Sequence, residues 1–467
     1  MKEALNWLSE NYSHLVQNLA ELVAIPSIST DGRHAQEIDR SAEAVSRQMQ
    51  QAGLQNVRIL RFKDSYPYVY GEWCNAPGKP TAFLYSHHDV QPVAGFEKDW
   101  QSEPWTLTAR GGRLYGRGSA DDKAAIVAQL GSLEACLKTT GSLPINVKML
   151  VEGEEEIGSK NLMGFFKEYR DLIRSDVIIV NDTENLETGL PSITYSLRGI
   201  VALEVEVEGL KRPVHSGAGG GLLPDAAIAL NVILSRLYWD NGKLPIPGFY
   251  ERVRRLTPSE KKAYSQLPLD EEKLRKDAAM LPGVSWASMK GINPYEQTWR
   301  WPAVTVIAQE ASSFQAVSNQ VLPKARAVVS CRIVPDMDPK ETEEQLTKVL
   351  TKDPPWGVKV TVKPRGPHVK WWMTDPQGPA FEAAMSALRS GYKRDPVAIG
   401  SGGTIGFVGP LADLLGGAPA LLLGIEDPRS NAHAPNESLH EGDWKKLMAS
   451  LVHLYHNLAS LPNGRVK

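Results

Sequence analysis

Histidine and carboxylate side chains follow directly after several apolar runs that have the length of a buried strand. In chain order these segments are SHHDVQP after TAFLY (81–85), EGEEEIGS after VKMLV (147–151), ND after VIIV (177–180) and EDPRSNAHAPNE after PALLLGI (419–425). Ligand sites of open parallel sheets form at the carboxyl ends of the strands. We therefore expect His87, Asp182 and His433 to gather at one edge of a sheet, together with acids of the second segment.

Crowded negative charge at this edge indicates a bound cation. Four glutamates stand within residues 152–156, and no lysine or arginine stands among them. The segment GRGSADDK (116–123) adds Asp121 and Asp122 just before a predicted helix. Burying unpaired carboxylates costs free energy unless positive charge is held among them. Histidine with carboxylate is the ligand set of zinc, manganese or cobalt, and paired ions use bridging carboxylates. The sequence therefore predicts two divalent metal ions.

The local spacing of these residues indicates how they are oriented. His87 and Asp89 are two positions apart on extended chain, so they point to one side while His88 points to the other. An acid on that side can accept the second N–H of a ligand histidine and fix its tautomer. Glu155 and Glu156 are adjacent and face different directions. One can bind metal while the other accepts a proton from water as a general base.

The remaining acids of these segments are given simpler roles. Glu152 and Glu154 are expected to be solvated acids at the start of a helix, where negative charge is favourable. Asp122 is expected to be an acid at a helix N-terminus or a group that supports the ligands, rather than a ligand itself.

The elements that must position these groups alternate along the chain. Apolar strands and helical patterns follow one another at 67–73, 81–85, 124–137, 147–151, 161–169 and 177–180. This alternation is typical of a mostly parallel sheet covered by helices on both faces. The same character returns from about residue 377, with another buried strand at 419–425.

A different pattern occupies the middle of the chain. Residues 200–209 alternate strictly, and they precede a helix at 224–238, strands at 303–308 and 325–334, a helix at 340–351 and a strand at 357–363. This β-α-β-β-α-β order suits a ferredoxin-like sandwich with an unassigned insertion at about 240–302. We therefore predict an α/β catalytic domain, formed by residues 1–199 and 371–467, that is interrupted by a ferredoxin-like α+β domain at 200–370.

Composition argues against several classes of function. A length of 467 residues fits two or three domains. A chain with 42% hydrophobic residues, 23% charged residues and a net charge of −2 is an ordinary soluble protein with no electrostatic reason to bind nucleic acid or a membrane. No apolar run could span a bilayer, and the N-terminal segment is spaced like an amphipathic helix rather than a secretory signal. Three scattered cysteines indicate a cytoplasmic protein.

The ordered motifs resemble those of a known enzyme family. HHDVQP, GRGSADDK, EGEEEIGS, the ND before SLRG, VHSG, SGGT and AHAPNE occur in the order found in the co-catalytic zinc metallopeptidases. That family includes carnosinases, cytosolic dipeptidases, aminoacylase, carboxypeptidase G and succinyl-diaminopimelate desuccinylase. The likeness covers nearly the whole chain and is greatest to the carnosinase-like dipeptidases. It implies a two-zinc catalytic domain interrupted by a lid domain through which such proteins commonly form homodimers.

The resemblance also implies roles for single residues in the metal site. Asp121 would be the carboxylate that bridges the two ions. His87 and Asp182 would complete the ligands of one ion, and Glu156 and His433 those of the other.

Further residues would act on water and substrate. Glu155 would be the general base, and Asp89 the acid behind the ligand histidine. His215, in PVHSGAGGG, matches the lid histidine that reaches into the partner subunit's site and stabilises the oxyanion. Asn319, Arg332 and the SGGT loop, with Gly403 and Thr404, would bind substrate. The residues before that loop, Ala398-Ile399-Gly400, differ from the Arg-Glu pair usual in the family, so the loop does not define the substrate.

These features predict a metal-dependent hydrolase that cleaves the amide bond of dipeptides or similar small peptides. A hydroxide bridging the two ions would attack the carbonyl, with Glu155 as the general base. Zinc is the expected metal, and manganese or cobalt are the alternatives. The alternative substrates are N-acyl or N-carbamoyl amino acids, but many deacylases of the family have glutamate where this chain has Asp182. A catalytically inactive binding protein would have lost ligands or the base, and all are present here.

Overall fold

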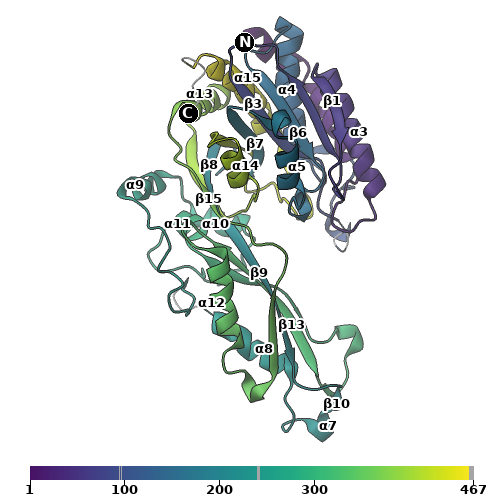
Figure 1. The fold of residues 1–467 in the computed structure, drawn as a ribbon, viewed down its shortest axis with the longest axis vertical. Coiled ribbons are helices and arrows are strands. Elements are labelled where there is room, and N and C mark those ends of the chain that lie inside the picture. Colours follow the sequence, from purple (N-terminus) through teal and green to yellow (C-terminus); the bar gives the residue numbers. More distant parts are fainter. Residues whose placement is uncertain (94, 96, 239–241, 462–467) are drawn as a thin grey trace. The chain divides into compact units, whose positions relative to one another are not determined.

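The computed structural model describes residues 1–93, 95, 97–238 and 242–461. The chain forms two compact units (Figure 1). The first contains Met1–Tyr195, Thr374–Ile399 and the chain from Phe407 onward, and the second contains Ser196–Met373 and Gly400–Gly406. In the described part, no helix combines the length and the apolar composition needed to cross a membrane.

A mainly parallel sheet forms the centre of the first unit. Its strands lie in the order β1 (Gln55–Leu60), β2 (Tyr68–Trp73), β6 (Asn146–Glu152), β3 (Thr81–His87), β7 (Val177–Glu184), β17 (Ala420–Glu426) and β8 (Ser192–Leu197). The four central strands, from β6 to β17, are parallel, and the outer strands pair antiparallel. His87 is opposite Glu152, and Glu426 is opposite Glu184, so the carboxyl ends of the central strands form one edge. The predicted mostly parallel sheet is confirmed.

Strand β3 is buried on both faces, as its apolar sequence predicts. Ala82 and Leu84 belong to the core that includes residues of α4 (Lys123–Thr140) and α15 (Glu441–Ala459). Side chains of successive strand residues point to opposite faces. These two therefore mark the face of the sheet that the two helices cover.

Aromatic side chains fill the opposite face of the same strand. Phe83 meets Phe166 of α5 (Leu162–Glu168) edge-on, with ring centroids 6.0 Å apart. Tyr85 packs against Phe407, with ring centroids 4.1 Å apart. Cover on both faces is the arrangement that parallel sheets require.

Helix α4, which begins beside the acids of the GRGSADDK segment, is deeply buried. Its residues are buried from Lys123 to Cys136, as befits a helix that is apolar nearly all round. The Lys123 ammonium donates to the carbonyl oxygens of Leu22 and Ile25, at 2.8 Å each. Because the helix begins directly after Asp122, its packing also fixes the aspartates that precede it.

The other elements of the first unit surround this core. They are α1 (Lys2–Glu10), α2 (Tyr12–Val23), α3 (Ala35–Gln51), α6 (Arg170–Ile173), α13 (Pro379–Tyr392), α14 (Val408–Leu414), β16 (Val397–Ser401), which pairs with β8, and a three-stranded sheet of β18 (Ser438–His440), β5 (Arg113–Tyr115) and β4 (Thr108–Arg110). The predicted N-terminal helix is broken at Asn11. There the backbone N–H and the side-chain Nδ2 both donate to the carbonyl of Trp7.

A four-stranded antiparallel sheet forms the core of the second unit. Its order is β11 (Ala303–Glu310), β13 (Lys324–Ile333), β9 (Gly199–Glu208) and β14 (Lys359–Pro364). The buried residues of β9 alternate strictly, and they share a core with α8 (Ala226–Leu234) and α12 (Pro339–Thr351). The chain order β9-α8-β11-β13-α12-β14 has the predicted β-α-β-β-α-β succession. Short elements complete the unit: β10 (Val214–His215), α7 (Ser216–Gly219), β12 (Gln320–Val321) and β15 (Trp372–Met373), which pairs antiparallel with β8.

The insertion, which the sequence left unassigned, contains three short helices. They are α9 (Pro258–Gln266), α10 (Glu271–Asp277) and α11 (Pro294–Arg300); residues 239–241, where the insertion begins, lie outside the described part. The ring of Trp299 stacks on Tyr295 at 4.8 Å. A Cβ added at Gly400 would come within 2.7 Å of the Trp299 Cβ. Helix α11 therefore packs against the start of the SGGT segment.

Candidate active site

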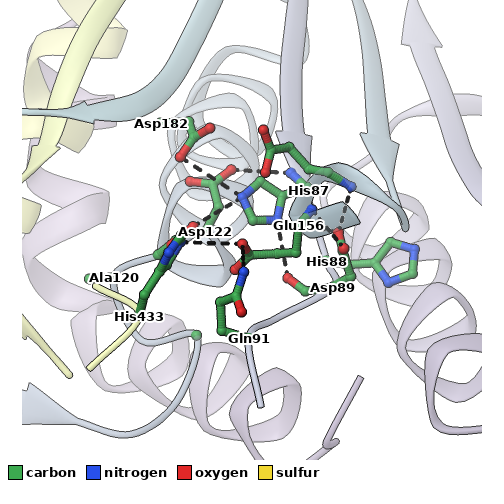
Figure 2. A network of polar contacts seen from close by, with 12 residues as sticks. His87, His88, Asp89, Gln91, Ala120, Asp122, Glu156, Asp182 and His433 are labelled. Carbon is green, nitrogen blue, oxygen red and sulfur yellow. Dashed lines mark hydrogen bonds and ion pairs between the residues drawn. The ribbon is translucent and has the colours of Figure 1, made fainter. Parts of the chain in front are cut away.

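The carboxyl edge of the central sheet gathers the predicted metal ligands (Figure 2). His87 is the last residue of β3, Asp182 lies in β7, and Glu156 lies in the turn after β6. Asp121 precedes α4, and His433 lies between β17 and β18. Five distant segments of the chain thus contribute to one cluster.

One carboxylate of this cluster lies between two histidines. Oδ1 of Asp121 is 3.1 Å from Nε2 of His87, and its Oδ2 is 2.9 Å from Nε2 of His433. Asp182 Oδ1 lies 3.8 Å from the first imidazole, and Glu156 Oε2 lies 3.2 Å from the second. A carboxylate that presents one oxygen to each of two such groups has the arrangement of a bridging ligand.

The side chains in this cluster fit a pair of divalent ions. Among the described residues, three sets have ligand atoms within 4.8 Å of one another; they are His87, Asp122 and Asp182; Asp121, Glu156 and His433; and Asp121, Asp182 and Glu426. Nε2 of His87 is buried and makes no hydrogen bond with any described residue, although two carboxylates lie nearby. Neutral imidazole and carboxylate are the donors that zinc, manganese and cobalt accept.

The acid behind the first histidine connects two parts of the cluster. Nδ1 of His87 lies 3.1 Å from the carbonyl oxygen and 3.4 Å from Oδ1 of Asp89, which places the ring proton on Nδ1 and leaves Nε2 free. The Asp89 carboxylate also accepts from Ser29 Oγ and from the backbone N–H groups of Glu155 and Glu156. Burial acts to raise the pKa of Asp89, but the hydrogen bonds, first of all that with His87, outweigh it and lower this pKa.

Burial and neighbouring charge raise the pKa values of several groups in the cluster. Burial raises the pKa of Glu155 well above its ordinary value, and burial with the charge of Asp121 raises the pKa of Glu156 to about 7. Burial also raises the pKa of Asp182. Contacts with Asp121 and Glu156 raise the pKa of His433 to about 11. A divalent ion would displace protons from these groups when it binds, because ligands must be deprotonated.

The two adjacent glutamates have different surroundings. Oε2 of Glu156 accepts from Gln91 Nε2 at 2.7 Å and lies beside His433. In the described part of the chain, the Glu155 carboxylate has no hydrogen-bond or ion-pair partner, and its charge interacts with His87 and Asp182. An uncommitted carboxylate with a raised pKa beside ligand groups has the properties of a general base.

Comparison with known proteins decides the family. A model of Peptidase family M20/M25/M40 matches residues 83–457. The chain belongs to this family. It is 31% identical over 434 residues to a cysteinylglycine-S-conjugate dipeptidase of Corynebacterium striatum, with 92% of each chain covered. It is 27% identical over 463 residues to the Beta-Ala-His dipeptidase of Homo sapiens, with 95% of this chain and 90% of that protein covered.

Solved structures of M20 peptidases have the same fold. Dug1p of Saccharomyces cerevisiae, described as a di-peptidase, matches with a TM-score of 0.88 at 25% identity over 99% of both chains. Human carnosine dipeptidase 1 matches with a TM-score of 0.88 at 26% identity, over 98% of this chain and 99% of that chain. The predicted fold class, the predicted family and the predicted class of enzyme, a metallopeptidase, are confirmed.

A further carboxylate of this M20 peptidase was missed in the sequence. Glu426, the last residue of β17, is 7% exposed, and its oxygens lie within 4.8 Å of those of Asp121 and Asp182. It directly follows the apolar run 419–425, which is the same signal that identified the other acids. Asp122 accepts from the backbone N–H of His87 at 3.1 Å, which fits its predicted supporting role.

The prediction that Glu152 and Glu154 are solvated is wrong. Both are buried, because β6 extends to Glu152 and tyrosines from β2 and β3 reach both carboxylates. Tyr68 donates to Glu154, and Tyr85 donates to Oε2 of Glu152. Oε1 of Glu152 has no hydrogen-bond partner in the described residues, and burial raises the pKa of this carboxyl to about 8.

The predicted substrate-binding residues form two groups in the second unit. Nη1 of Arg332 donates to Thr404 Oγ1 at 2.6 Å, and Thr404 Oγ1 donates to the carbonyl of Arg198, also at 2.6 Å. His215 pairs with Gln320 in the two-stranded sheet of β10 and β12, and Asn319 is the residue before Gln320.

Strand β13 separates these two groups. Asn319 and His215 lie near Lys324, where the strand begins, and Arg332 lies at its other end. Eight residues of strand span about 27 Å. Arg332, Gly403 and Thr404 are therefore brought together, but His215 and Asn319 are not brought to them.

The buried carboxyl of Glu152 makes stability depend on pH. Its folded pKa of about 8 exceeds the ordinary value of 4.5, so the folded state keeps the proton to higher pH and loses stability as the pH rises between these values. Each unit of separation is worth about 1.4 kcal/mol. Urea unfolding of metal-loaded protein from pH 5 to pH 9 should show the Glu152→Gln variant gaining stability relative to the parent. The exposed Glu168→Gln is the control, and a Glu152→Gln difference that does not change with pH contradicts the assignment.

Proposed function

We propose that this M20 peptidase is a dipeptidase that holds two divalent ions per subunit at the carboxyl edge of its central sheet. The observation that carries the proposal is the Asp121 carboxylate, which lies between His87 and His433 with one oxygen near each. Asp182 joins the first histidine, and Glu156 joins the second. Zinc fits these donors best, and manganese and cobalt fit the same set.

Different residues of the cluster would then have different roles in hydrolysis. Bound divalent ions acidify a water and polarise the scissile carbonyl. Glu155 takes the proton from the attacking water and gives it to the leaving amine. Asp89 keeps the ring proton of His87 on Nδ1, so that Nε2 stays available.

Two arginines without carboxylate partners in the described part of the chain favour a substrate that carries a free carboxylate. Arg198 and Arg332 hold the SGGT loop, and neither guanidinium has a carboxylate partner in the described residues. Burial, followed by the charge of Arg332, lowers the pKa of Arg198 to about 10. The C-terminal carboxylate of a dipeptide would supply the missing negative charge. The relatives named as dipeptidases support the same substrate class.

We also propose a homodimer formed through residues 200–370, which act as a lid and dimerisation domain. In the described residues, no strand pairs with the outer edge of β11. Val306 and Ile307 on this strand and Ile228 and Val232 on α8 are exposed. An unpaired edge with exposed apolar side chains is a template for another chain. A partner subunit would also give His215, distant from Arg332, a site in which to stabilise the oxyanion.

A reducing compartment suits this protein, and we propose the cytoplasm. Cys74, Cys136 and Cys331 are all free. Burial raises the pKa of the two buried thiols, Cys136 to about 11 and Cys331 to about 12. Thiols of this kind are unreactive and stay reduced in the cytoplasm.

Replacing the general base should separate catalysis from metal binding. In Glu155→Gln, kcat for an unblocked dipeptide should fall by about 10² to 10⁴-fold, because the amide cannot take the proton. Metal analysis of the same sample should still find two ions per chain. Glu168→Gln, an exposed change of the same type, should keep full activity. Near-normal turnover by Glu155→Gln would exclude this residue as the base.

Arg332 should determine the preference for a free carboxylate. The parent protein should cleave a dipeptide in preference to the same dipeptide with a C-terminal amide. Arg332→Leu should raise KM for the dipeptide by about 10 to 100-fold, the worth of a charged hydrogen bond, and should remove the preference. Arg365→Leu, which changes an exposed arginine, is the control. Cleavage of N-acetyl amino acids while dipeptides stay intact would identify a deacylase instead.

A charge on the open edge strand should prevent dimer formation. Ile307 is 60% exposed, and Ile307→Lys should convert the dimer to a monomer in light scattering, because burying an ammonium at an interface is costly. Activity should fall with it, since each site would lose the partner's histidine. Ile59→Lys, on the edge strand β1, should leave the dimer unchanged. A parent protein that is monomeric at micromolar concentration would refute the proposal.

A further inference from the structure

The side chain of His433 is not fixed by burial. His433 is exposed over 58% of its side chain, in contrast to His87, whose side chain is fully buried. Asn431, His433 and Asn436 all have positive φ, of 53°, 62° and 60°. Non-glycine residues hold this conformation at a cost, and it persists where the surroundings enforce it.

A buried ion pair holds the upstream end of the segment that carries His433. Both oxygens of Asp427 accept from the Arg113 guanidinium at 2.8 Å. Arg113 also donates to Oγ and to the carbonyl oxygen of Ser438, at 2.8 and 3.0 Å. Residues 427 and 438 are thereby tied to one side chain, which closes the segment into a loop.

A second buried ion pair, Arg117–Glu437, holds the downstream end of the segment and contacts the residue next to His433. Oε2 of Glu437 accepts from Arg117 Nη1 at 2.7 Å and from the Gly118 N–H at 2.9 Å. Nη2 of Arg117 lies 3.4 Å from the carbonyl oxygen of Ala434, the residue after His433. Arg117 is 2% exposed and Glu437 is fully buried.

The same glutamate also holds the backbone of the shared carboxylate. Oε1 of Glu437 accepts from the N–H groups of Ala120 and Asp121, at 2.8 and 3.0 Å. One side chain thus contacts the backbone of Asp121 and stands four residues after His433. Two ligand residues that are 312 positions apart in the sequence share a single buried support.

We propose that the buried Arg117–Glu437 ion pair is a positioning element that sets the affinity of the metal position formed by Asp121, Glu156 and His433. The exposed imidazole keeps its place because the ion pair fixes the backbone on its C-terminal side and the backbone of Asp121 together. The position that depends on the buried His87 shares Asp121, but its histidine is held by burial and by Asp89, so this position is less sensitive to the pair. The inference rests on the ligand assignment in the proposed function.

Zinc titration of metal-free protein against a competing chelator tests this inference. In Glu437→Gln the amide oxygen can still accept from Ala120 and Asp121, but the NH2 group then faces Arg117. We expect zinc affinity at the position of His433 to fall by about 10 to 100-fold, the usual cost of losing a group that supports a ligand, and affinity at the position of His87 to fall by less. The variants His433→Ala and His87→Ala identify which binding event belongs to which position.

Asp443→Asn is the matched control, because Asp443 is a buried acid paired with Lys446 and bonded to the Gly189 N–H. This change should lower the melting temperature and leave both zinc affinities intact, which separates positioning from general stability. If Glu437→Gln fails to fold, Arg117→Lys keeps the charge, cannot reach both Glu437 and Ala434, and should weaken the same position. Unchanged zinc affinities in the variant that folds overturn the inference.

Separate outcomes test the ligand assignment and the positioning role. If His433→Ala leaves both binding events intact, the ligand assignment itself is wrong. If His433→Ala removes one event but Glu437→Gln weakens neither, the ligands stand and the positioning role is wrong.

Discussion

The two oxygens of Asp121 lie 3.1 and 2.9 Å from the imidazoles of His87 and His433, and further carboxylates surround both rings. Repulsion between buried acids is strong because the protein interior screens charge poorly. Burial is the main cause that raises the pKa values of Glu155 and Glu156, and the negative charges of neighbouring acids add to it. Two divalent cations would offset this repulsion. The fold therefore has to hold these acids close together against their mutual repulsion.

Three features of the first unit hold the acids of the cluster in place. The parallel register ends neighbouring strands at one edge, and the burial of α4 fixes the chain at Asp122. Asp89 connects the remaining pieces, since it orients His87 and accepts the backbone N–H groups of Glu155 and Glu156. Each contact uses a group that would otherwise cost free energy to bury. Stability and preorganisation of the ligands therefore come from the same hydrogen bonds.

The sequence was informative where a local rule has a geometric consequence. Strand-length apolar runs followed by His87, Asp182 and the glutamates predicted a parallel sheet and one shared edge, and the structure has both. The roles assigned to these residues stay predictions. The rule of strict alternation likewise predicted β9 and the β-α-β-β-α-β order of its unit.

Sequence reasoning failed where partners are distant in the chain. Glu152 and Glu154 looked like solvated acids because the tyrosines that cover them, Tyr85 and Tyr68, stand 67 and 86 positions away. The bond between Arg117 and Glu437 joins residues 320 positions apart and leaves no local pattern. The packing of α11 against Gly400 was equally invisible, because the insertion has no periodic signal.

The two halves of the cluster are held in different ways, and this difference has a chemical consequence. His87 is fully buried, so the fold closes its side of the cluster to solvent. His433 is largely exposed and lies on a segment supported at its ends. On the proposed ligand assignment, water and substrate would reach the cluster from the side of His433. A ligand at an entrance cannot be fixed by burial without blocking that entrance, so its position has to come from the backbone that carries it. That requirement explains why buried ion pairs stand at the ends of an exposed segment in which three non-glycine residues have positive φ.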